Sequence, residues 1–390
     1  MAEAYIVDAV RTAGGRRNGR LAGWHPVDLG AAVLDAAVAR TGIDPAAIED
    51  VIMGCVMQVG EQGLHVGRNA VLASSLPASV PAVSIDRQCG SSQQAIQFAA
   101  QAVMSGTQDV VIAAGVESMS RVPMGSSGQW SREPQAGSAS SAGLAAKYPG
   151  IVFSQFTGAE MIAEKYQFSR ETLDAFAAES HRKAARATEA GAFEAEILSL
   201  TVTGPDSEEE QHRTDEGIRF DASPEGLAAL KTLVPGGRIT AGNASQICDG
   251  ASAVMIVSEA ALKAHGLTPL ARIHNLTVTG GDPVVMLEEP LYATDKALKR
   301  AGLGISDIDL FEVNEAFAPV PLAWLHHVGA DPERLNVNGG AIALGHPLGA
   351  SGTKLMATLV HALRARGGRY GLQTMCEGGG VANLTIVEAL

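Results

Sequence analysis

Short apolar runs alternate with longer amphipathic stretches along most of the chain. Residues 4–12 (AYIVDAVRT) are mainly apolar and predict a strand. Residues 32–40 (AVLDAAVAR) have the apolar spacing of a helix, which Gly42 would end, and the apolar run VIMG follows at 51–54. Strands that alternate with helices in this way are typical of an α/β fold in which helices connect parallel strands.

The order of predicted elements repeats with an offset of about 260 residues. Residues 293–314 again give a helix, a glycine stop at Gly302 and an apolar strand (LFEV), in the order already seen at 32–54. An internal repeat of this kind indicates two similar structural units in one chain.

A second pair of segments extends the repeat. Residues 83–115 contain an apolar run (VSID), a loop with Cys89, a helix and a strand, and residues 335–375 contain LNVN, a loop with His346, a helix and YGLQTM. The helix at 91–105 is so apolar that it predicts burial on all sides, between two sheets. We therefore predict two pseudo-symmetric α/β domains in a layered αβαβα core.

The region between the repeats has a different composition, with Gly/Ser-rich runs and an acidic stretch at 206–216 that predicts a solvated loop. It reads as an inserted loop domain over 121–238. The predicted N-terminal domain then consists of residues 1–120 plus 239–267, and the C-terminal domain of residues 268–390.

Composition and charge narrow the classes of function. The chain has 390 residues, of which 46% are hydrophobic and 18% charged, and this excludes an intrinsically disordered protein. A net charge of −13 argues against nucleic-acid binding. The N-terminus lacks the charge pattern of a signal peptide, and the uncharged stretch 88–108 carries too many glutamines for a membrane span. We expect a cytoplasmic protein without membrane insertion.

Three residues stand out as candidates for chemistry. Cys89 opens a predicted helix, where the helix dipole would lower its pKa and favour the nucleophilic thiolate, although a lone cysteine is more often a small buried side chain. His346 lies in a glycine-rich loop and could act as an acid/base group or simply bond the backbone. Cys376 ends a predicted strand before three glycines. Because ligands collect at the carboxyl ends of strands in doubly wound sheets, we expect these three residues to share a cleft.

Several ordered motifs give the chain a resemblance to the thiolase family. They are EAYIVDAVRT near the start, CGSS at 89–92, GVESMS at 115–120, GNASQICDGA at 242–251, VNEAFA at 313–318, GGAIALGHPLGASG at 339–352 and CEGGG at 376–380. The resemblance implies two thiolase-type domains with an inserted loop domain. It also implies an acyltransferase that cleaves 3-ketoacyl-CoA with coenzyme A, or condenses two acyl-CoA molecules, through an acyl-cysteine intermediate.

The resemblance also implies roles for individual residues. Cys89 would be the acylated nucleophile, His346 would take its proton, and Cys376 would exchange the α-carbon proton of the second thioester. The family stabilises the enolate oxygen with the histidine and a water held by an asparagine, here Asn314, and the acyl-enzyme oxyanion with the backbone N–H groups of Cys89 and Gly378.

Coenzyme A contacts are expected from Ser245, Phe317 and Arg219. Each has an alternative reading, as a helix cap, a core residue and a solvated loop charge respectively. CoA and acyl-CoA are expected as substrates, with no permanently bound cofactor and no metal, in a homodimer or homotetramer.

The chain departs from the usual family pattern at three places. Ser92 stands where a glycine is common, and Glu377 stands where an apolar residue is usual, so that a buried carboxylate there would raise the pKa of Cys376. Residues 154–157 read SQFT where biosynthetic acetoacetyl-CoA thiolases have HMG. This last departure leaves room for degradation of longer or bulkier acyl groups, including ring-derived ones.

Two other functions compete with this reading. A ketosynthase-like condensing enzyme would share the fold, but it normally lacks a second reactive cysteine, which Cys376 supplies here. A non-catalytic scaffold that only binds CoA esters should have lost reactive groups, whereas this chain retains Cys89, Asn314, His346 and Cys376.

Overall fold

The computed structural model describes residues 2–129, 137–204 and 208–390. Its first half contains strands β1 (Ala4–Thr12), β2 (Gly15–Arg16), β3 (Asp50–Gly54), β4 (Ala82–Ile85), β5 (Val110–Ser118) and β9 (Cys248–Ser258), with helices α1 (Pro26–Thr41), α2 (Val66–Ala73), α3 (Ser91–Ser105) and α8 (Glu259–His265). The predicted strand at 4–12 and the predicted helix at 91–105 are confirmed.

The second half repeats this arrangement. It contains β10 (Ala271–Gly280), β11 (Leu310–Val313), β12 (Tyr370–Glu377) and β13 (Val381–Ala389), with α9 (Glu289–Ala301), α10 (Pro319–Val328), the short α11 (Ala341–Leu344) and α12 (Ser351–Ala365). One expected counterpart is missing: LNVN at 335–338 forms only an isolated bridge, between Leu335 and Phe311. Asn336 adopts a φ of 43°, which interrupts the extended backbone, and its side chain bonds the backbone of Val313 instead.

The two halves share one sheet, ordered β11-β12-β13-β10-β1-β9-β5-β3-β4. They join where β1 and β10 pair over only two positions, Tyr5 with Arg272 and Ile6 with Ala271. The predicted parallel pairing is present between β3 and its neighbours β4 and β5 and between β11 and β12, but β9 and β13 run antiparallel to their neighbours. In the second half the reason is local: only three residues connect β12 to β13, and so short a link cannot make a parallel crossover.

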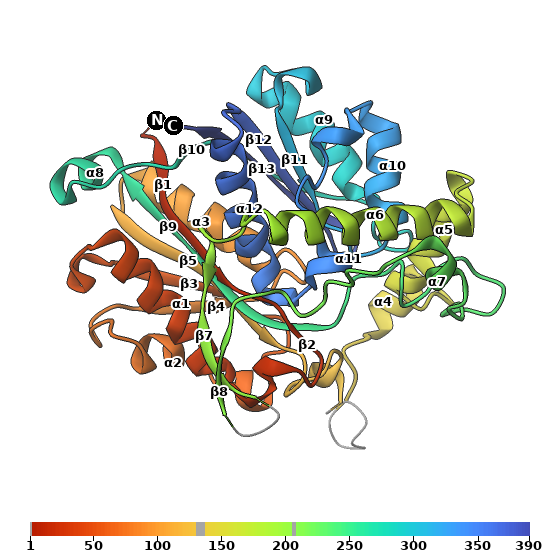
Figure 1. Cartoon of the computed structure of the whole chain (residues 1–390), viewed down its shortest axis with the longest axis horizontal. Helices are drawn as coiled ribbons and strands as arrows, with labels where there is room; N and C mark the ends of the chain where they lie inside the picture. Colours follow the sequence, from red (N-terminus) through yellow and green to blue (C-terminus); the bar gives the residue numbers. More distant parts are fainter. Residues whose placement is uncertain (1, 130–136, 205–207) are drawn as a thin grey trace.

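The two halves of this sheet serve as the two β layers, and the helices form the predicted layers around and between them (Figure 1). Helices α1 and α2 pack on the outer face of the first half, and α9 and α10 on the outer face of the second. Between the halves, α3 and α12 bury their apolar side chains against β1, β9 and β10 in one core. The αβαβα architecture is confirmed, and the two central helices each begin directly after a loop with a candidate catalytic residue.

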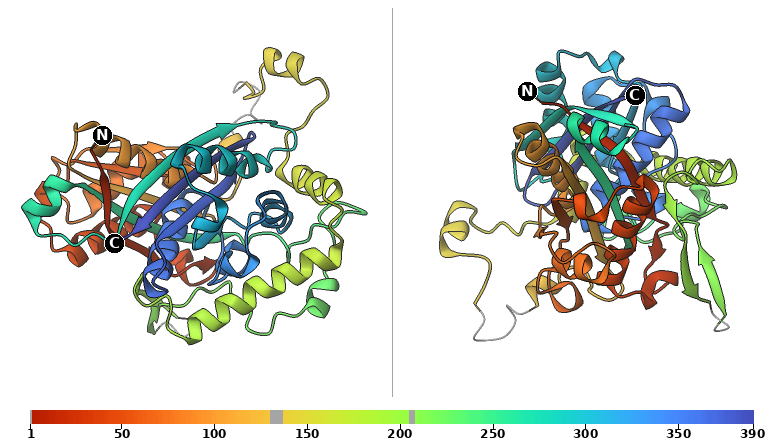
Figure 2. Two further views of the ribbon diagram at one scale, coloured as in Figure 1. Left: turned by 90° about the horizontal axis from the view of Figure 1, so that it is seen from above. Right: turned by 90° about the vertical axis from the view of Figure 1, so that its left-hand side faces the viewer.

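The region between the halves contains α4 (Ala142–Lys147), α5 (Gln155–Lys165), α6 (Arg170–Glu189), β6 (Ile197–Leu198), α7 (Pro224–Ala228) and a hairpin of β7 (Leu200–Thr203) with β8 (Glu209–His212). The long α6 runs beside the second half, and α4 projects away from the body (Figure 2). Among the described residues, no helix has the length and apolarity needed to cross a membrane.

The acidic stretch at 206–216 is only partly the solvated loop that its composition predicts. Residues 206 and 207 lie outside the described part of the chain, and β8 takes up the next segment. Asp215 is buried because the guanidinium of Arg11, itself fully buried, donates to both of its carboxylate oxygens, at 2.8 and 3.0 Å.

Candidate active site

Cys89 lies in the tight turn that joins β4 to α3. Gln88, just before it, adopts a φ of 49°, a left-handed conformation that is uncommon for a residue with a side chain. Two side chains hold the turn: Asp86 Oδ1 accepts from the Gln88 N–H at 2.7 Å, and Ser91 Oγ accepts from the Arg87 N–H at 2.9 Å. The turn therefore places the thiol at the N-terminus of α3, where the sequence predicted it.

The end of β12 docks directly onto this turn. Glu377 is fully buried, and its carboxylate lies so close to Gly90 that a side chain at Gly90 would overlap it. Gly378 packs on the side chain of Gln88, whose Oε1 would be 3.0 Å from an added Cβ. These contacts on both sides of Cys89 bring it beside Cys376.

Both thiols are less acidic than a free cysteine. Burial, followed by the nearby Glu377, raises the pKa of Cys89 to about 12. Burial, followed by Cys89 and Glu377, raises the pKa of Cys376 well above its usual value. The prediction that Glu377 raises the pKa of Cys376 is confirmed. The prediction that the helix dipole lowers the pKa of Cys89 is wrong, because loss of water around the thiolate outweighs the helix dipole. A nucleophilic Cys89 therefore needs a base.

His346 is suited to be that base. Its Nδ1 lies 2.5 Å from Ser351 Oγ, which donates its own proton to the Pro347 carbonyl at 2.8 Å. Ser351 must therefore accept from an Nδ1–H, which leaves Nε2 unprotonated. Burial, and then the charge of Lys354, lower the pKa of His346 to about 3, so the imidazole is neutral at physiological pH.

Asn314 directly follows β11, and its side chain contacts the imidazole of His346. Its Nδ2 donates to His346 Nε2 at 3.4 Å, and its backbone N–H donates to the Thr374 carbonyl at 3.0 Å, near the end of β12. Asn314 is buried, and its Oδ1 has no hydrogen-bond partner in the described part of the chain. The amide oxygen is thus available to a water or a substrate.

The structure gathers the four predicted side chains where the two halves meet. Cys89 packs in one apolar cluster with Leu348, two residues after His346, and Cys376 packs in another with Phe317, three residues after Asn314. The resulting junction holds two thiols, one neutral imidazole and one carboxamide. Such a set can carry acyl transfer through sulfur together with proton transfer.

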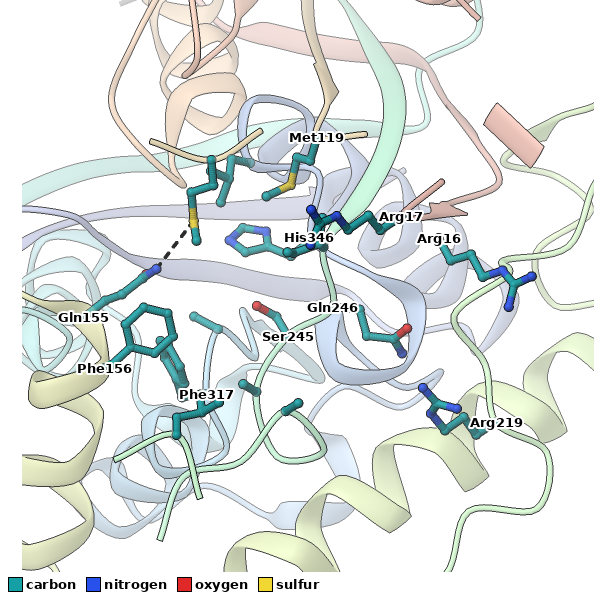
Figure 3. A pocket seen from close by; sticks show the side chains of 17 residues that line it. Arg16, Arg17, Met119, Gln155, Phe156, Arg219, Ser245, Gln246, Phe317 and His346 are labelled. Atoms are coloured by element: carbon teal, nitrogen blue, oxygen red, sulfur yellow. Dashed lines mark hydrogen bonds between the residues drawn. The ribbon is translucent and has the colours of Figure 1, made fainter. Parts of the chain in front are cut away.

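A cavity of about 400 Å³ leads to His346 (Figure 3). All three residues predicted to contact coenzyme A, Arg219, Ser245 and Phe317, line it, whereas the two cysteines do not. No helix begins at Ser245, which excludes its reading as a cap, while Phe317 is also part of a core cluster and Arg219 is exposed. The other lining residues are Arg16, Arg17, Met119, Met124, Gln155, Phe156, Leu233, Ala241, Ala244, Gln246, Ile247, Ala316 and Leu348.

Sequence reasoning missed two cations of this cavity. Arg16 and Arg17 come after β1 in the sequence and lie at the same end of the cavity as Arg219 (Figure 3). Arg16 pairs with Glu216 at 3.2 Å between Nε and Oε1. The only sequence signal was the arginine pair in RTAGGRR, which says nothing about a partner segment some 200 residues away.

Two of the departures from the family pattern have visible contacts. Ser92 Oγ accepts from the backbone N–H of Thr353 at 3.0 Å, so this serine links the first turns of α3 and α12. Phe156, in the SQFT segment, packs edge to face on Phe317 with ring centroids 5.6 Å apart. The segment that replaces HMG therefore forms a wall of the cavity.

Comparison with known proteins agrees with this geometry. The family models for the thiolase N-terminal and C-terminal domains match residues 4–260 and 267–389. The chain is 53% identical to the steroid 3-ketoacyl-CoA thiolase of Mycobacterium tuberculosis, over 100% of this chain and 95% of that protein. It is 42% identical to the 3-ketoacyl-CoA thiolase of Bacillus subtilis, over the full length of both.

Solved structures show the same likeness. The human mitochondrial 3-ketoacyl-CoA thiolase superposes with a TM-score of 0.90 at 36% identity, over 100% of this chain and 99% of that one. The acetyl-CoA acetyltransferase of Bacillus anthracis superposes with a TM-score of 0.91 at 36% identity, with the same coverage. The chain belongs to the thiolase family. The expected activity, reversible acyl transfer between CoA thioesters, is thereby confirmed.

Proposed function

We propose that the protein cleaves 3-ketoacyl-CoA substrates that carry a bulky apolar acyl group, with Cys89, His346 and Cys376 as its catalytic residues. The observation that carries the catalytic part is the combination of two buried thiols of raised pKa with a neutral histidine whose Nε2 is unprotonated. Thiols of this kind stay protonated until a neighbouring base accepts the proton, and this limits side reactions of the free enzyme.

In the proposed cleavage, His346 Nε2 takes the proton of Cys89, and the sulfur attacks the 3-keto carbon. The bond between C2 and C3 breaks, and its electron pair forms the enolate of acetyl-CoA, which takes a proton from Cys376. The acyl group stays on Cys89. The Cys376 thiolate then takes the proton of the incoming CoA thiol, whose sulfur displaces Cys89, and His346 returns its proton. Condensation follows the same steps in reverse.

Two groups of donors support the charged intermediates in this proposal. The enolate oxygen meets His346, protonated at that stage, and a water that donates to Asn314 Oδ1, which is otherwise without a partner in the described chain. The oxyanion formed at Cys89 meets the backbone N–H groups of Cys89 and Gly378. The docking of Gly378 on the nucleophile turn supports this pairing.

Coenzyme A binding is assigned to the cavity. Ser245 and Phe317 line the path of the pantetheine arm, and Arg16, Arg17 and Arg219 carry positive charge for the phosphates at its mouth. Such local cations can hold an anionic substrate although the whole chain has a net charge of −13. Arg17→Ala should raise the KM for CoA about tenfold with little change in kcat, and Lys263→Ala, at an exposed surface ion pair, should change neither.

The apolar cavity wall supports a bulky acyl group. Met124, Phe156 and Leu233 line the cavity and remain 41%, 36% and 45% exposed, so an apolar substrate would cover surface that now faces water. The relative named as a steroid thiolase is 53% identical over the full chain, and SQFT stands in place of the HMG of biosynthetic enzymes.

Substrate choice can be tested with ring-derived, long straight-chain and acetoacetyl thioesters of CoA in the same thiolysis assay. We expect the highest kcat/KM for the ring-derived thioester, and a loss of that preference in Phe156→Ala. A maximum at a straight-chain substrate would contradict the proposed acyl group and leave the catalytic assignment intact.

A homo-oligomer in the cytoplasm completes the proposal. Helix α4 buries none of its residues, and the apolar side chains of Leu144, Ile151 and Val152 in and after it are 38%, 42% and 85% exposed. This projecting arm (Figure 2) suits contact with a second copy of the chain. Light scattering should give the mass of a dimer or tetramer, and a monomer at micromolar concentration would contradict it.

A further inference from the structure

A cluster of buried charges lies behind the loop that carries His346. It consists of Arg11 from β1, Glu196 and Asp215 from the region between the halves, and Lys354 from α12, and we call it the buried charge cluster. Arg11 donates to Glu196 Oε1 at 2.6 Å and to both oxygens of Asp215. The ammonium of Lys354 lies 3.7 Å from Asp215 Oδ1. All four side chains are at least 95% buried.

Lys354 connects this cluster to the catalytic loop. Its Nζ donates to the carbonyl of Leu344 at 2.5 Å and to that of Gly345 at 3.3 Å, the two residues directly before His346. These carbonyls end α11, where a helix leaves backbone acceptors without intrahelical partners. Gly345 has a φ of 80°, and Cys248 packs against it. Among the described residues, Lys354 is the side chain that donates to these two carbonyls.

Other contacts fix the remaining sides of the loop. The backbone N–H of His346 donates to the Gln246 carbonyl at 3.0 Å, and Glu117 Oε2 accepts from the Gly349 N–H at 2.8 Å. The groups that face the loop are therefore Lys354, backed by Asp215 and Arg11, the carboxylate of Glu117 from β5, and the thiols of Cys89, Cys248 and Cys376. Among them, Lys354 supplies the positive charge that acts on the imidazole.

We propose that Lys354 is a positioning residue for His346: it holds the Leu344 and Gly345 carbonyls in place, and its ammonium adds to the burial that disfavours a charged imidazole. The proposal rests on the proposed role of His346 as the base. A buried ion pair that served packing alone could be replaced by apolar side chains at little cost. Here the ammonium also satisfies two backbone acceptors beside the base, and it lies next to Asp215, which Arg11 and the Gly14 N–H hold in place.

The test compares Lys354→Met and Lys354→Gln in the full chain with Lys183→Met as the matched control. Lys183, on α6, also donates to a backbone carbonyl, that of Leu335 at 2.8 Å, which lies eleven positions before His346 in the sequence. We expect kcat for thiolysis to fall about 10- to 100-fold in Lys354→Met, which misplaces the base, and less in Lys354→Gln, which keeps an N–H donor, with KM within about twofold in both. The control should keep its kcat.

A second readout separates positioning from a loss of stability. With the ammonium gone, protonation of His346 becomes easier, so the acidic limb of the kcat/KM profile should move to higher pH in both Lys354 variants. The same shift should appear in the NMR titration of the imidazole in free enzyme. Lys354→Gln keeps an N–H donor, so it tests the charge even if Lys354→Met does not fold.

An unchanged acidic limb and an unchanged imidazole titration in folded Lys354→Gln would overturn the proposal. The imidazole titration needs no substrate. It therefore tests the role of Lys354 separately from the proposed function, which a lack of thiolysis by the unmodified protein would contradict.

Discussion

Ser351 Oγ lies 2.5 Å from Nδ1 of His346 and donates its proton to the Pro347 carbonyl. This single hydroxyl therefore determines which imidazole nitrogen carries the proton. With Nδ1 protonated, the lone pair of Nε2 faces the Asn314 amide, and it is the nitrogen that accepts the Cys89 proton in the proposed cycle.

Removing the Ser351 hydroxyl should impair the base without changing the lining of the cavity, to which Ser351 does not belong. Ser351→Ala is expected to lower kcat for thiolysis about tenfold or more, because part of the neutral histidine then adopts the other tautomer. Nitrogen-15 NMR of labelled histidine should show the mixed tautomer, and Ser306→Ala, at an exposed serine, serves as the control. Full activity with a mixed tautomer would show that the tautomer does not limit the rate.

Glu377 should set the pH dependence of both thiols. Glu377→Gln removes a negative charge beside Cys89 and Cys376, so the pKa of each thiol should fall. Alkylation by iodoacetamide should then reach half its maximal rate at lower pH, and the basic limb of thiolysis, where Cys376 loses its proton, should move the same way. Identical alkylation midpoints in the two proteins would contradict the electrostatic role of Glu377.

The same carboxyl group should also make stability depend on pH. Burial raises the pKa of Glu377 to about 8 in the folded protein, from 4.5. Below about pH 4.5 the carboxyl group is protonated in both the folded and the unfolded protein, so it does not change the free energy of unfolding. As pH rises from there towards 8, the unfolded state loses the proton first and gains stability relative to the folded state. The Tm advantage of Glu377→Gln over the unmodified protein should therefore grow between pH 5 and pH 9 in calorimetry, and a constant difference would contradict this.

Gly352 should be needed for the two central helices to meet. A side chain at this position would overlap the backbone of Gln93 on α3. Gly352→Ala is expected to lower the free energy of unfolding by about 1–3 kcal/mol or more and to reduce kcat, because the loops of Cys89 and His346 precede these helices. Gly23→Ala has open space around its Cβ and is the control. Equal urea midpoints for the two variants would argue against close helix contact.

Arg11 should be a major contributor to stability. Arg11→Met leaves Glu196 and Asp215 buried without their main partner, and a loss of about 3–5 kcal/mol is expected in urea unfolding. Arg186→Met, at a surface pair with Glu179 that is 3.2 Å apart, should cost at most about 1 kcal/mol. Similar losses in both variants would contradict the importance of burial.

The spacing of apolar and polar residues along the sequence predicted most of the strands and helices that build the site. The strand before Cys89, the helix after it and the repeat around His346 follow from local apolar spacing, which depends on neighbours in sequence. Local spacing predicted a strand at residues 335–338, but the segment forms only an isolated bridge. The side chain of Asn336 bonds the backbone of Val313, and local spacing does not encode this contact. The three-part division of the chain at 120, 238 and 267 stays a prediction.

Electrostatics were the hardest property to predict. A helix N-terminus suggested an acidic Cys89, whereas the pKa is raised because the thiol is buried beside Glu377, 288 positions away in the sequence. Arg16, Arg17, Asp215 and Lys354 were also missed. Arg16, Asp215 and Lys354 have partners from distant segments, and composition or motif spacing does not reveal such partners.

In the proposed mechanism, Cys89 carries the acyl group during thiolysis. The most direct test is intact-protein mass spectrometry after mixing with a 3-ketoacyl-CoA, comparing the unmodified protein with Cys89→Ala. We predict a mass increase equal to the acyl group on Cys89, released by added CoA, and neither adduct nor turnover in the variant. Turnover by Cys89→Ala, or an acyl group on another residue, would contradict the account.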